Sequence, residues 1–274
     1  MTQGTEPAAG EAVPSSEPEP GGGPGPGRRR GGRGLAVLGV VGELLITLGL
    51  VLGLFVAYSL WWTDVLANRS ATAASDQLRE SWASGAPAAP PSAGAAAPGG
   101  VPSAAAGTGF AAGDGIGFLH VPAMGRDYQV LIRMGTDTAT LAEGVAGVYE
   151  QPYRSAMPWD ASGNFALAAH RDGHGAKFHE LDAVGKGDAI VVETRDKWYV
   201  YRVDSTLPET SKYDTGIVAP VPKGSGYTAP GRYITLTTCT PVYTSRYRMA
   251  VWGSLVRVDD MDAARTPPAE LRKH

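Results

Sequence analysis

The sequence predicts a mainly β domain that follows a single membrane-spanning helix. Two observations support this prediction: a 20-residue uncharged apolar run, Leu44–Thr63, and a series of short β-rich runs after Thr108. Sixteen of the 37 glycines and 11 of the 21 prolines fall in two stretches, 1–34 and 83–109. Neither stretch has enough large apolar side chains to offset the entropy of ordering its backbone. About 150 residues remain, which is enough for one domain with a well-packed core.

The apolar run is long enough to cross a bilayer. At about 1.5 Å of rise per residue it spans about 30 Å, the thickness of the hydrocarbon core. Arg28–Arg30 and Arg33 precede the run, whereas the other flank begins with Asp64. This charge bias predicts a cytoplasmic N-terminus and a single-pass membrane protein whose later residues lie outside. A cleaved signal peptide is the alternative, but its apolar region would exceed the usual length of about 7–15 residues.

These features divide the chain into five parts. One short helix is expected around Leu78 and Trp82, and the Ala/Gly/Pro/Ser stretch after it would act as a partly stiffened tether with a reach of about 30 Å. The parts are a disordered cytoplasmic tail (1–34), a transmembrane helix (35–63), an extracytoplasmic tether (64–109), a folded domain (110–260) and a flexible C-terminal tail (261–274).

Seven runs of the outer domain carry β-branched or aromatic residues with partial alternation, which predicts a barrel or a sandwich. We expect one short helix at Thr138–Val145, with Asp137 or Thr138 as its N-cap, and a helical turn at Ala176–Leu181. No internal repeat is visible, which disfavours a propeller or a solenoid. The seven runs are Ile116–Val121, Tyr128–Arg133, Asn164–Ala169, Asp188–Thr194, Lys197–Asp204, Tyr233–Thr238 and Met249–Val258.

Charge and cysteine usage exclude several classes of protein. The chain has 24 Lys and Arg against 27 Asp and Glu, and this net charge of −3 argues against a nucleic-acid binder that relies on a basic excess. The single cysteine, Cys239, forms no intrachain disulfide and supplies no multi-cysteine metal site. The sequence contains neither a GxSxG elbow nor a Walker loop.

Cys239 directly follows the β-rich run Tyr233–Thr238, and Pro241 then prevents further regular strand pairing. A thiol at the end of a strand can face a cleft. Arg248 opens the next apolar run, so a loop that folds back would leave it beside the thiol. The alternative is a buried, inert cysteine, since free cysteine is commonly buried.

A second polar loop follows the apolar run Phe165–Ala169. His170 ends this run, and His174 and His179 follow in a glycine-containing loop. A zinc site formed by the three histidines is the alternative, but the intervening glycines disfavour a continuous helix and no HExxH glutamate is present. We therefore expect no metal and no cofactor.

The side chains of His170, Cys239 and Arg248 have complementary chemistry. A thiol is mostly protonated at neutral pH, and a nearby imidazolium or guanidinium favours the nucleophilic thiolate. A protonated histidine can deliver a proton to a leaving amine. Arginine is always protonated, so it can donate hydrogen bonds to a carbonyl or an oxyanion but cannot act as a base. The Thr238 hydroxyl could add a further donor.

These tracts resemble the sortases, membrane-anchored cysteine transpeptidases and thiol proteases of Gram-positive bacteria. The resemblance covers about residues 115–258 and is carried by TLTTC ending at Cys239, ALAAHRDG containing His170, and RMAVWG beginning at Arg248. The HRDG-to-FHEL tract and the proline after the cysteine look most like class E enzymes of actinobacteria. Arg246 is the other candidate arginine, but Arg248 directly precedes the apolar strand, as in the family pattern.

The resemblance implies a closed eight-stranded β-barrel with short helices, and cleavage of a C-terminal LAxTG-like or LPxTG-like sorting signal between Thr and Gly. Cys239 would attack the threonine carbonyl to form a thioacyl-enzyme, and His170 would protonate the departing glycine amine. Arg248 and Thr238 would stabilise the oxyanion. An amine of a lipid II-type peptidoglycan precursor would then resolve the thioester. The implied partners are this precursor, surface proteins with sorting signals, and the membrane.

Two other interpretations of the same residues stay open. A thiol hydrolase would release the peptide with water and form no amine adduct. The order of His170 before Cys239 disfavours the papain arrangement, in which the cysteine comes first. A membrane-anchored binding module without enzymatic activity would keep Cys239 in its core, where it reacts slowly with thiol reagents.

Overall fold

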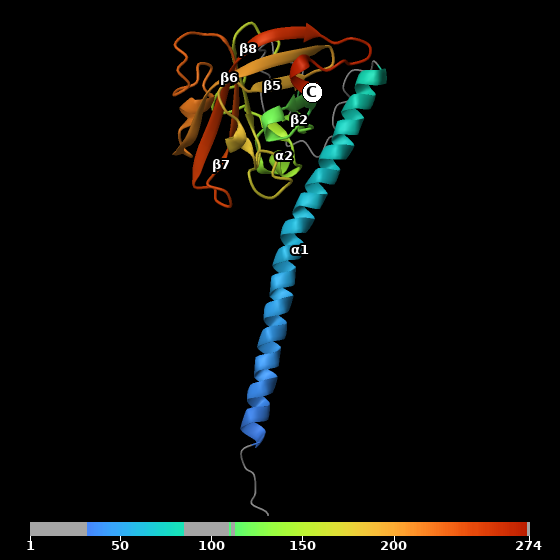
Figure 1. Ribbon diagram of the computed structural model, residues 1–274, viewed down its shortest axis with the longest axis vertical. Helices are drawn as coiled ribbons and strands as arrows, with labels where there is room; N and C mark the ends of the chain where they lie inside the picture. Colours follow the sequence, from blue (N-terminus) through green and yellow to red (C-terminus); the bar gives the residue numbers. More distant parts are fainter. Residues whose placement is uncertain (1–31, 85–109, 111–112, 273–274) are drawn as a thin grey trace, which may run out of the picture. The chain divides into compact units, whose positions relative to one another are not determined.

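The computed structural model describes residues 32–84, 110 and 113–272 (Figure 1). The chain forms two compact units, Met1–Gly53 and Leu54–His274. The described part of the first unit belongs to helix α1, Gly32–Ser84, whose remaining residues are in the second unit together with a β-barrel.

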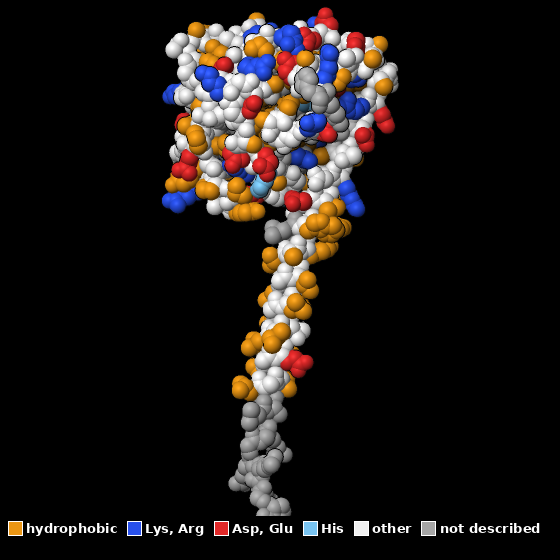
Figure 2. All heavy atoms as spheres, in the orientation of Figure 1, with side chains coloured by type: hydrophobic (Ala, Val, Ile, Leu, Met, Phe, Trp, Pro, Cys, Tyr) orange, Lys and Arg blue, Asp and Glu red, His pale blue; other side chains and the backbone are white. Residues whose placement is uncertain are grey.

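Helix α1 includes the apolar run and continues beyond it. Most described side chains from Val37 to Trp62 are exposed, and Figure 2 shows hydrophobic side chains along the visible face of this part of the helix. Among the described residues, α1 is the one helix long and apolar enough to cross a membrane. The first 31 residues of the expected cytoplasmic tail and the tether residues 85–109 lie outside the described residues.

The helix does not end at Thr63, where the transmembrane part was expected to end. Residues 64–84, which were assigned to the tether, are helical, and the short helix expected around Leu78 is their last part. The physical reason is tertiary packing: Leu78 is buried with Phe118, Leu131 and Val145 of the domain. A helix of mixed polarity is stable when one of its faces is packed in this way.

The second unit contains a closed barrel in which the strands follow the order β1-β2-β3-β4-β7-β8-β6-β5, which confirms the implied eight-stranded fold. The pairs β2–β3 and β4–β7 are parallel, and the others are antiparallel. The strands are β1 (Gly115–His120), β2 (Gln129–Met134), β3 (Ala146–Val148), β4 (Gly163–Ala168), β5 (Ala189–Glu193), β6 (Lys197–Ser211), β7 (Arg232–Thr240) and β8 (Tyr247–Asp260).

All seven predicted strands are present, with ends that differ by a few residues except in β6, which continues to Ser211. The sequence analysis missed β3, whose three residues are too few to show an alternating pattern. The predicted helix is α2 (Thr138–Ala142), and Asp137 caps it by accepting hydrogen bonds from the N–H groups of Ala139 and Thr140.

The helical turn predicted at Ala176–Leu181 is present in part: residues 177–180 form turns, the N–H groups of His179 and Leu181 donate to the carbonyls three residues earlier, and a 3₁₀ helix begins at Leu181. The described 3₁₀ helices are η1 (Pro122–Met124), η2 (Leu181–Ala183), η3 (Thr215–Val218) and η4 (Ala269–Leu271).

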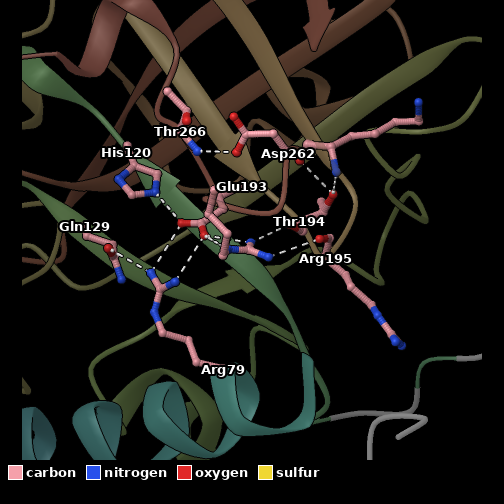
Figure 3. Close-up of polar contacts among 10 residues, drawn as sticks. Arg79, His120, Gln129, Glu193, Thr194, Arg195, Asp262 and Thr266 are labelled. Atoms are coloured by element: carbon pink, nitrogen blue, oxygen red, sulfur yellow. Dashed lines mark hydrogen bonds and ion pairs between the residues drawn. The ribbon is translucent and has the colours of Figure 1, made fainter. Parts of the chain in front are cut away.

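One buried carboxylate joins α1 and the C-terminal segment to the barrel (Figure 3). Glu193, at the end of β5, is 2% exposed. It accepts hydrogen bonds from Arg79 of α1 at 3.1 Å and from Arg265 at 2.8 Å, and its carboxylate lies 3.0 Å from His120 Nε2. Through Arg265, part of the segment 261–274, which was expected to be a flexible tail, is attached to the domain.

The same contacts fix the ionisation of Glu193. Burial opposes the charged form, but the hydrogen bonds with His120, Arg265 and Arg79 outweigh burial and lower the pKa of Glu193 to about 2. The carboxylate therefore stays negative throughout the physiological pH range, and it balances two guanidinium groups from segments that precede and follow the barrel in the sequence.

Replacing Glu193 by Gln is expected to lower the free energy of unfolding by about 3 kcal/mol at neutral pH, because two partly exposed arginines lose a buried counter-ion. The folded-state pKa of Glu193, about 2, is below its ordinary value of 4.5. Its contribution is therefore present above the ordinary pKa and is lost as the pH falls toward about 2. Urea denaturation of the full chain in detergent at several pH values measures the difference.

Glu209→Gln removes a carboxylate from an exposed position on β6 and serves as the control. It should change the free energy of unfolding by less than about 1 kcal/mol. A loss in Glu193→Gln that stays constant down to about pH 3 would contradict the proposed linkage.

Candidate active site

Cys239 lies one residue before the end of β7, and the strand ends before Pro241, which has no N–H to donate. The chain folds back, and in the antiparallel β7–β8 register Cys239 pairs directly with Arg248. Directly opposed residues project from the same face with their Cβ atoms about 4.5–5.5 Å apart. The thiol and the guanidinium therefore extend from neighbouring positions. Cys239 is partly exposed, unlike the inert core cysteine of the alternative interpretation.

His170 reaches the same place through the parallel pairing of β4 with β7. The last paired residues of β4 include Ala168, opposite Thr237. Beyond them, the Ala169 N–H donates to the carbonyl of Thr237 at 3.4 Å. Continuing this register by two residues brings His170 alongside Cys239.

The histidine loop, His170–Phe178, is attached to the elements around it. Phe178 is fully buried in the core, and its N–H donates to the His170 carbonyl at 2.9 Å. Arg171, also buried, donates to Met249 Sδ at 2.9 Å and pairs with Asp182 at 2.8 Å. Because Met249 follows Arg248 in β8, this contact fixes the loop relative to the arginine.

A further contact joins the histidine loop to the loop between β7 and β8. Asp172 Oδ2 accepts a hydrogen bond from the Tyr243 N–H at 2.5 Å. The residues after His170 and those after Cys239 are thus connected directly, in addition to the strand pairing.

His170 has an environment that favours the neutral imidazole. Its Nε2 atom is buried and has no hydrogen-bond partner among the described residues. The His174 ring lies next to it, with 5.1 Å between ring centroids. Burial, and secondarily the charge of His174, lower the pKa of His170 below its ordinary value of 6.5. A neutral imidazole can accept a proton, and with a lowered pKa it then returns that proton readily.

The two candidate arginines differ in position. Arg248 is in β8, and its Nη1 donates to the carbonyls of Ser245 at 3.1 Å and Tyr247 at 2.9 Å. Arg246 is exposed and lies before the strand, with its guanidinium 5.0 Å from the Tyr247 ring centroid. Since Arg248 is the residue paired with Cys239, the geometry favours it.

The Thr238 hydroxyl is already used in a contact within the domain. Its side chain is buried, and the hydroxyl donates to the Ala169 carbonyl at 2.8 Å. Side chains alternate along a strand, so Thr238 projects away from the face that carries Cys239. The hydroxyl supports the residue before His170, and this geometry does not favour it as an oxyanion donor.

Sequence reasoning missed Tyr149, which follows the short strand β3. Its hydroxyl lies 3.0 Å from Thr237 Oγ1. Burial raises the pKa of Tyr149, and the charges of Arg248 and Cys239 also act on it, in opposite directions. Because Thr237 is on the same face of β7 as Cys239, this contact brings Tyr149 close to the site. No motif marked it, because only the tertiary fold brings β3 beside β4.

The three histidines of the zinc alternative are not arranged as a metal site. In the part of the chain that the structure describes, no group of three or more His, Cys, Asp or Glu could hold a metal ion. His179 Nδ1 instead lies 2.9 Å from the Arg171 carbonyl.

Replacing His174 by Asn is expected to raise the pKa of His170, because the neighbouring histidine is one of the two causes that lower it. Asn is suitable because residue 174 has a φ of 48°, a left-handed conformation that Asn tolerates. NMR titration of the histidine rings in the full chain measures this pKa. His179→Asn should leave it unchanged, and an unchanged pKa in His174→Asn would refute the electrostatic assignment.

Comparison with known proteins identifies sortases as relatives of this chain. The sortase domain family matches residues 119–256. The chain is 52% identical to sortase SrtE2 of Streptomyces coelicolor over 93% of its own length and 96% of that protein. It is 42% identical to sortase SrtE1 of the same organism, over 83% of this chain and 60% of that protein.

Solved structures agree with the sequence comparison. Sortase E1 of Streptomyces coelicolor, crystallised with a tripeptide in the active site, is 44% identical with a TM-score of 0.54, covering 58% of this chain and 96% of that chain. Sortase E of Streptomyces avermitilis is 32% identical with a TM-score of 0.53, covering 60% of this chain and 100% of that chain. The chain therefore belongs to the sortase family of cysteine transpeptidases.

Proposed function

We propose that this sortase cleaves a C-terminal sorting signal with Cys239 as nucleophile, His170 as proton carrier and Arg248 as the group that binds the reacting carbonyl. The observation that supports these roles is the strand register. Pairing of β4 with β7 and of β7 with β8 brings all three residues to one end of three adjacent strands.

In the first half-reaction the thiol proton moves to the neutral imidazole of His170, and the thiolate of Cys239 attacks the threonine carbonyl of the signal. The Thr–Gly bond breaks, the imidazolium gives its proton to the departing glycine amine, and a thioester remains. In the second half-reaction the amine of a peptidoglycan precursor attacks the thioester and loses a proton through His170. That proton returns to the sulfur, so the enzyme is regenerated.

Arg248 would act on the oxygen of the tetrahedral intermediates. Its side chain is held by the carbonyls of Ser245 and Tyr247, so the positive charge is fixed before the substrate arrives. Donors fixed in advance stabilise a developing oxyanion without reorganisation during the reaction.

We propose LAxTG as the signal sequence, LPxTG being the alternative, because the chain resembles class E sortases. The substrates would be surface proteins that carry this signal at the C-terminus. The acceptor would be a precursor of the lipid II type, which supplies the amine.

Replacing Cys239 by Ala should abolish Thr–Gly cleavage of an LAxTG peptide, because the chain has no other thiol. Mass spectrometry of the full chain in detergent, with peptide and an amine, follows both cleavage and the amine adduct.

In the same assay, Arg248→Ala should lower kcat by about 10²–10³-fold. Arg246→Ala, the matched control, should change kcat by less than about twofold.

Two results would contradict these assignments. Turnover by Cys239→Ala would exclude Cys239 as the nucleophile. Free carboxylate product without an amine adduct at high amine concentration would favour the hydrolase alternative.

We further propose that α1 spans the membrane once, with the N-terminus in the cytoplasm and the barrel domain, expected at 110–260, outside. The arginines before the apolar run, Arg28–Arg30 and Arg33, support this orientation.

The single thiol provides a test of this orientation. A membrane-impermeant maleimide should label Cys239 in intact protoplasts, and permeabilisation should add little labelling. Cys239→Ala is the control for background. Labelling that requires permeabilisation would show that the barrel lies inside.

A further inference from the structure

We propose that the part of α1 directly after the apolar run, Asp64–Asn68, positions the histidine loop, and that Asp64 is the main positioning residue. This inference rests on the proposed role of His170. It assigns to the juxtamembrane helix a function in the reaction, in addition to membrane attachment.

Two polar contacts connect the helix to the loop. Asp64 Oδ1 accepts a hydrogen bond from the N–H of Gly175 at 2.8 Å. One helical turn further on, Asn68 Oδ1 accepts from Lys177 Nζ at 2.7 Å. Burial lowers the pKa of Lys177, and the negative charge of Asp64 opposes this shift.

The fit between helix and loop is also close sterically. Ala67, between the two polar residues, is 2% exposed. A Cβ atom added at Gly175 would approach Asn68 Oδ1 to 3.1 Å, and one added at Gly144 would approach the Ala67 carbonyl oxygen to 3.2 Å. The helix therefore packs directly on the loop and on Gly144, two residues after the end of α2.

The backbone of the loop explains why it needs this support. Four consecutive residues, 173–176, have φ values of 63°, 48°, 78° and 41°. His174 and Ala176 are not glycine, and left-handed backbone is unfavourable for residues with a Cβ atom. Such conformations persist only where surrounding contacts hold them. The hydrogen bond from Gly175 to Asp64 is at the centre of this strained run.

The position of the loop matters for the reaction because His174 is next to His170. The two rings are 5.1 Å apart between centroids, and the same loop continues to Phe178, whose N–H is bonded to the His170 carbonyl. If residues 173–176 relaxed to ordinary backbone angles, the ring beside His170 would move. The imidazole of His170 would then be less well placed beside the thiol of Cys239.

Helix α1 can act as a support because it is also held at a second point. Arg79, about four turns after Asp64, binds the buried carboxylate of Glu193 (Figure 3). Leu78 is buried in the same region, where Trp82 contacts Phe118 edge to face at 5.5 Å. Anchors at both ends hold this part of the helix along the barrel.

The test uses the full chain in detergent with the LAxTG peptide. Asp64→Ala should lower kcat by about tenfold, equivalent to about 1.4 kcal/mol, and leave the KM for the peptide unchanged. It should also slow iodoacetamide alkylation of Cys239, which reports thiolate formation at the only cysteine. Asp64→Asn retains an acceptor oxygen and should recover most of kcat. Glu80→Ala removes an exposed carboxylate from the same helix and should match the wild type.

A second variant keeps the proposal testable if Asp64→Ala does not fold. Ala67→Leu should push the helix away from the loop without removing a hydrogen bond, and it should lower kcat in the same way. Wild-type kcat in a folded Asp64→Ala or Ala67→Leu protein would overturn the proposal, as would a loss of kcat that Asp64→Asn does not recover. Turnover by Cys239→Ala would instead refute the proposed function.

Discussion

The parallel pairing of β4 with β7 is the constraint on which the candidate site depends. Side chains of successive strand residues alternate, so a slip by one residue would move every side chain to the other face and carry His170 away from Cys239. The pairing is fixed by a buried polar contact. Thr235 Oγ1 donates to Asn164 Oδ1 at 2.8 Å, and the Asn164 amide donates to the Ala219 carbonyl at 3.0 Å.

The threonines before Cys239 therefore have a structural explanation. Thr237 and Thr238 donate to the carbonyls of Leu167 and Ala169, so each binds the backbone of β4 or its continuation. A buried hydroxyl left without an acceptor would be unfavourable, and an apolar residue would not distinguish one register from the next. The sequence TLTTC combines the nucleophile with the contacts that align its strand.

Much of this arrangement was predictable from the sequence, because it depends on local patterns. Alternation located seven strands, and the apolar runs ending in His170 and Cys239 correctly indicated side chains at strand ends. Strand β3 was too short for a pattern. The contact of Thr238 and the presence of Tyr149 at the site depend on which strands are neighbours in the barrel. A local sequence pattern does not indicate this.

The full length of α1 was likewise not predictable from local sequence patterns. Its first part is apolar enough for the sequence alone to indicate a candidate membrane span. Its second part buries Ala67, Ala71 and Leu78, residues spaced by four and seven positions, as on one face of a helix. Alanines give a weak hydrophobic signal, and the partner surface is formed by residues far along the chain. Only the folded domain reveals that this face is packed.

The contacts of Glu193 have a consequence for how the domain can be divided. Arg79 and Arg265 lie 114 and 72 positions from Glu193 along the chain, on opposite sides of it. A fragment that begins after the tether keeps the complete barrel but leaves the buried carboxylate with one guanidinium instead of two. The folding unit is therefore larger than the barrel, because it also includes the part of α1 around Arg79 and the C-terminal segment around Arg265.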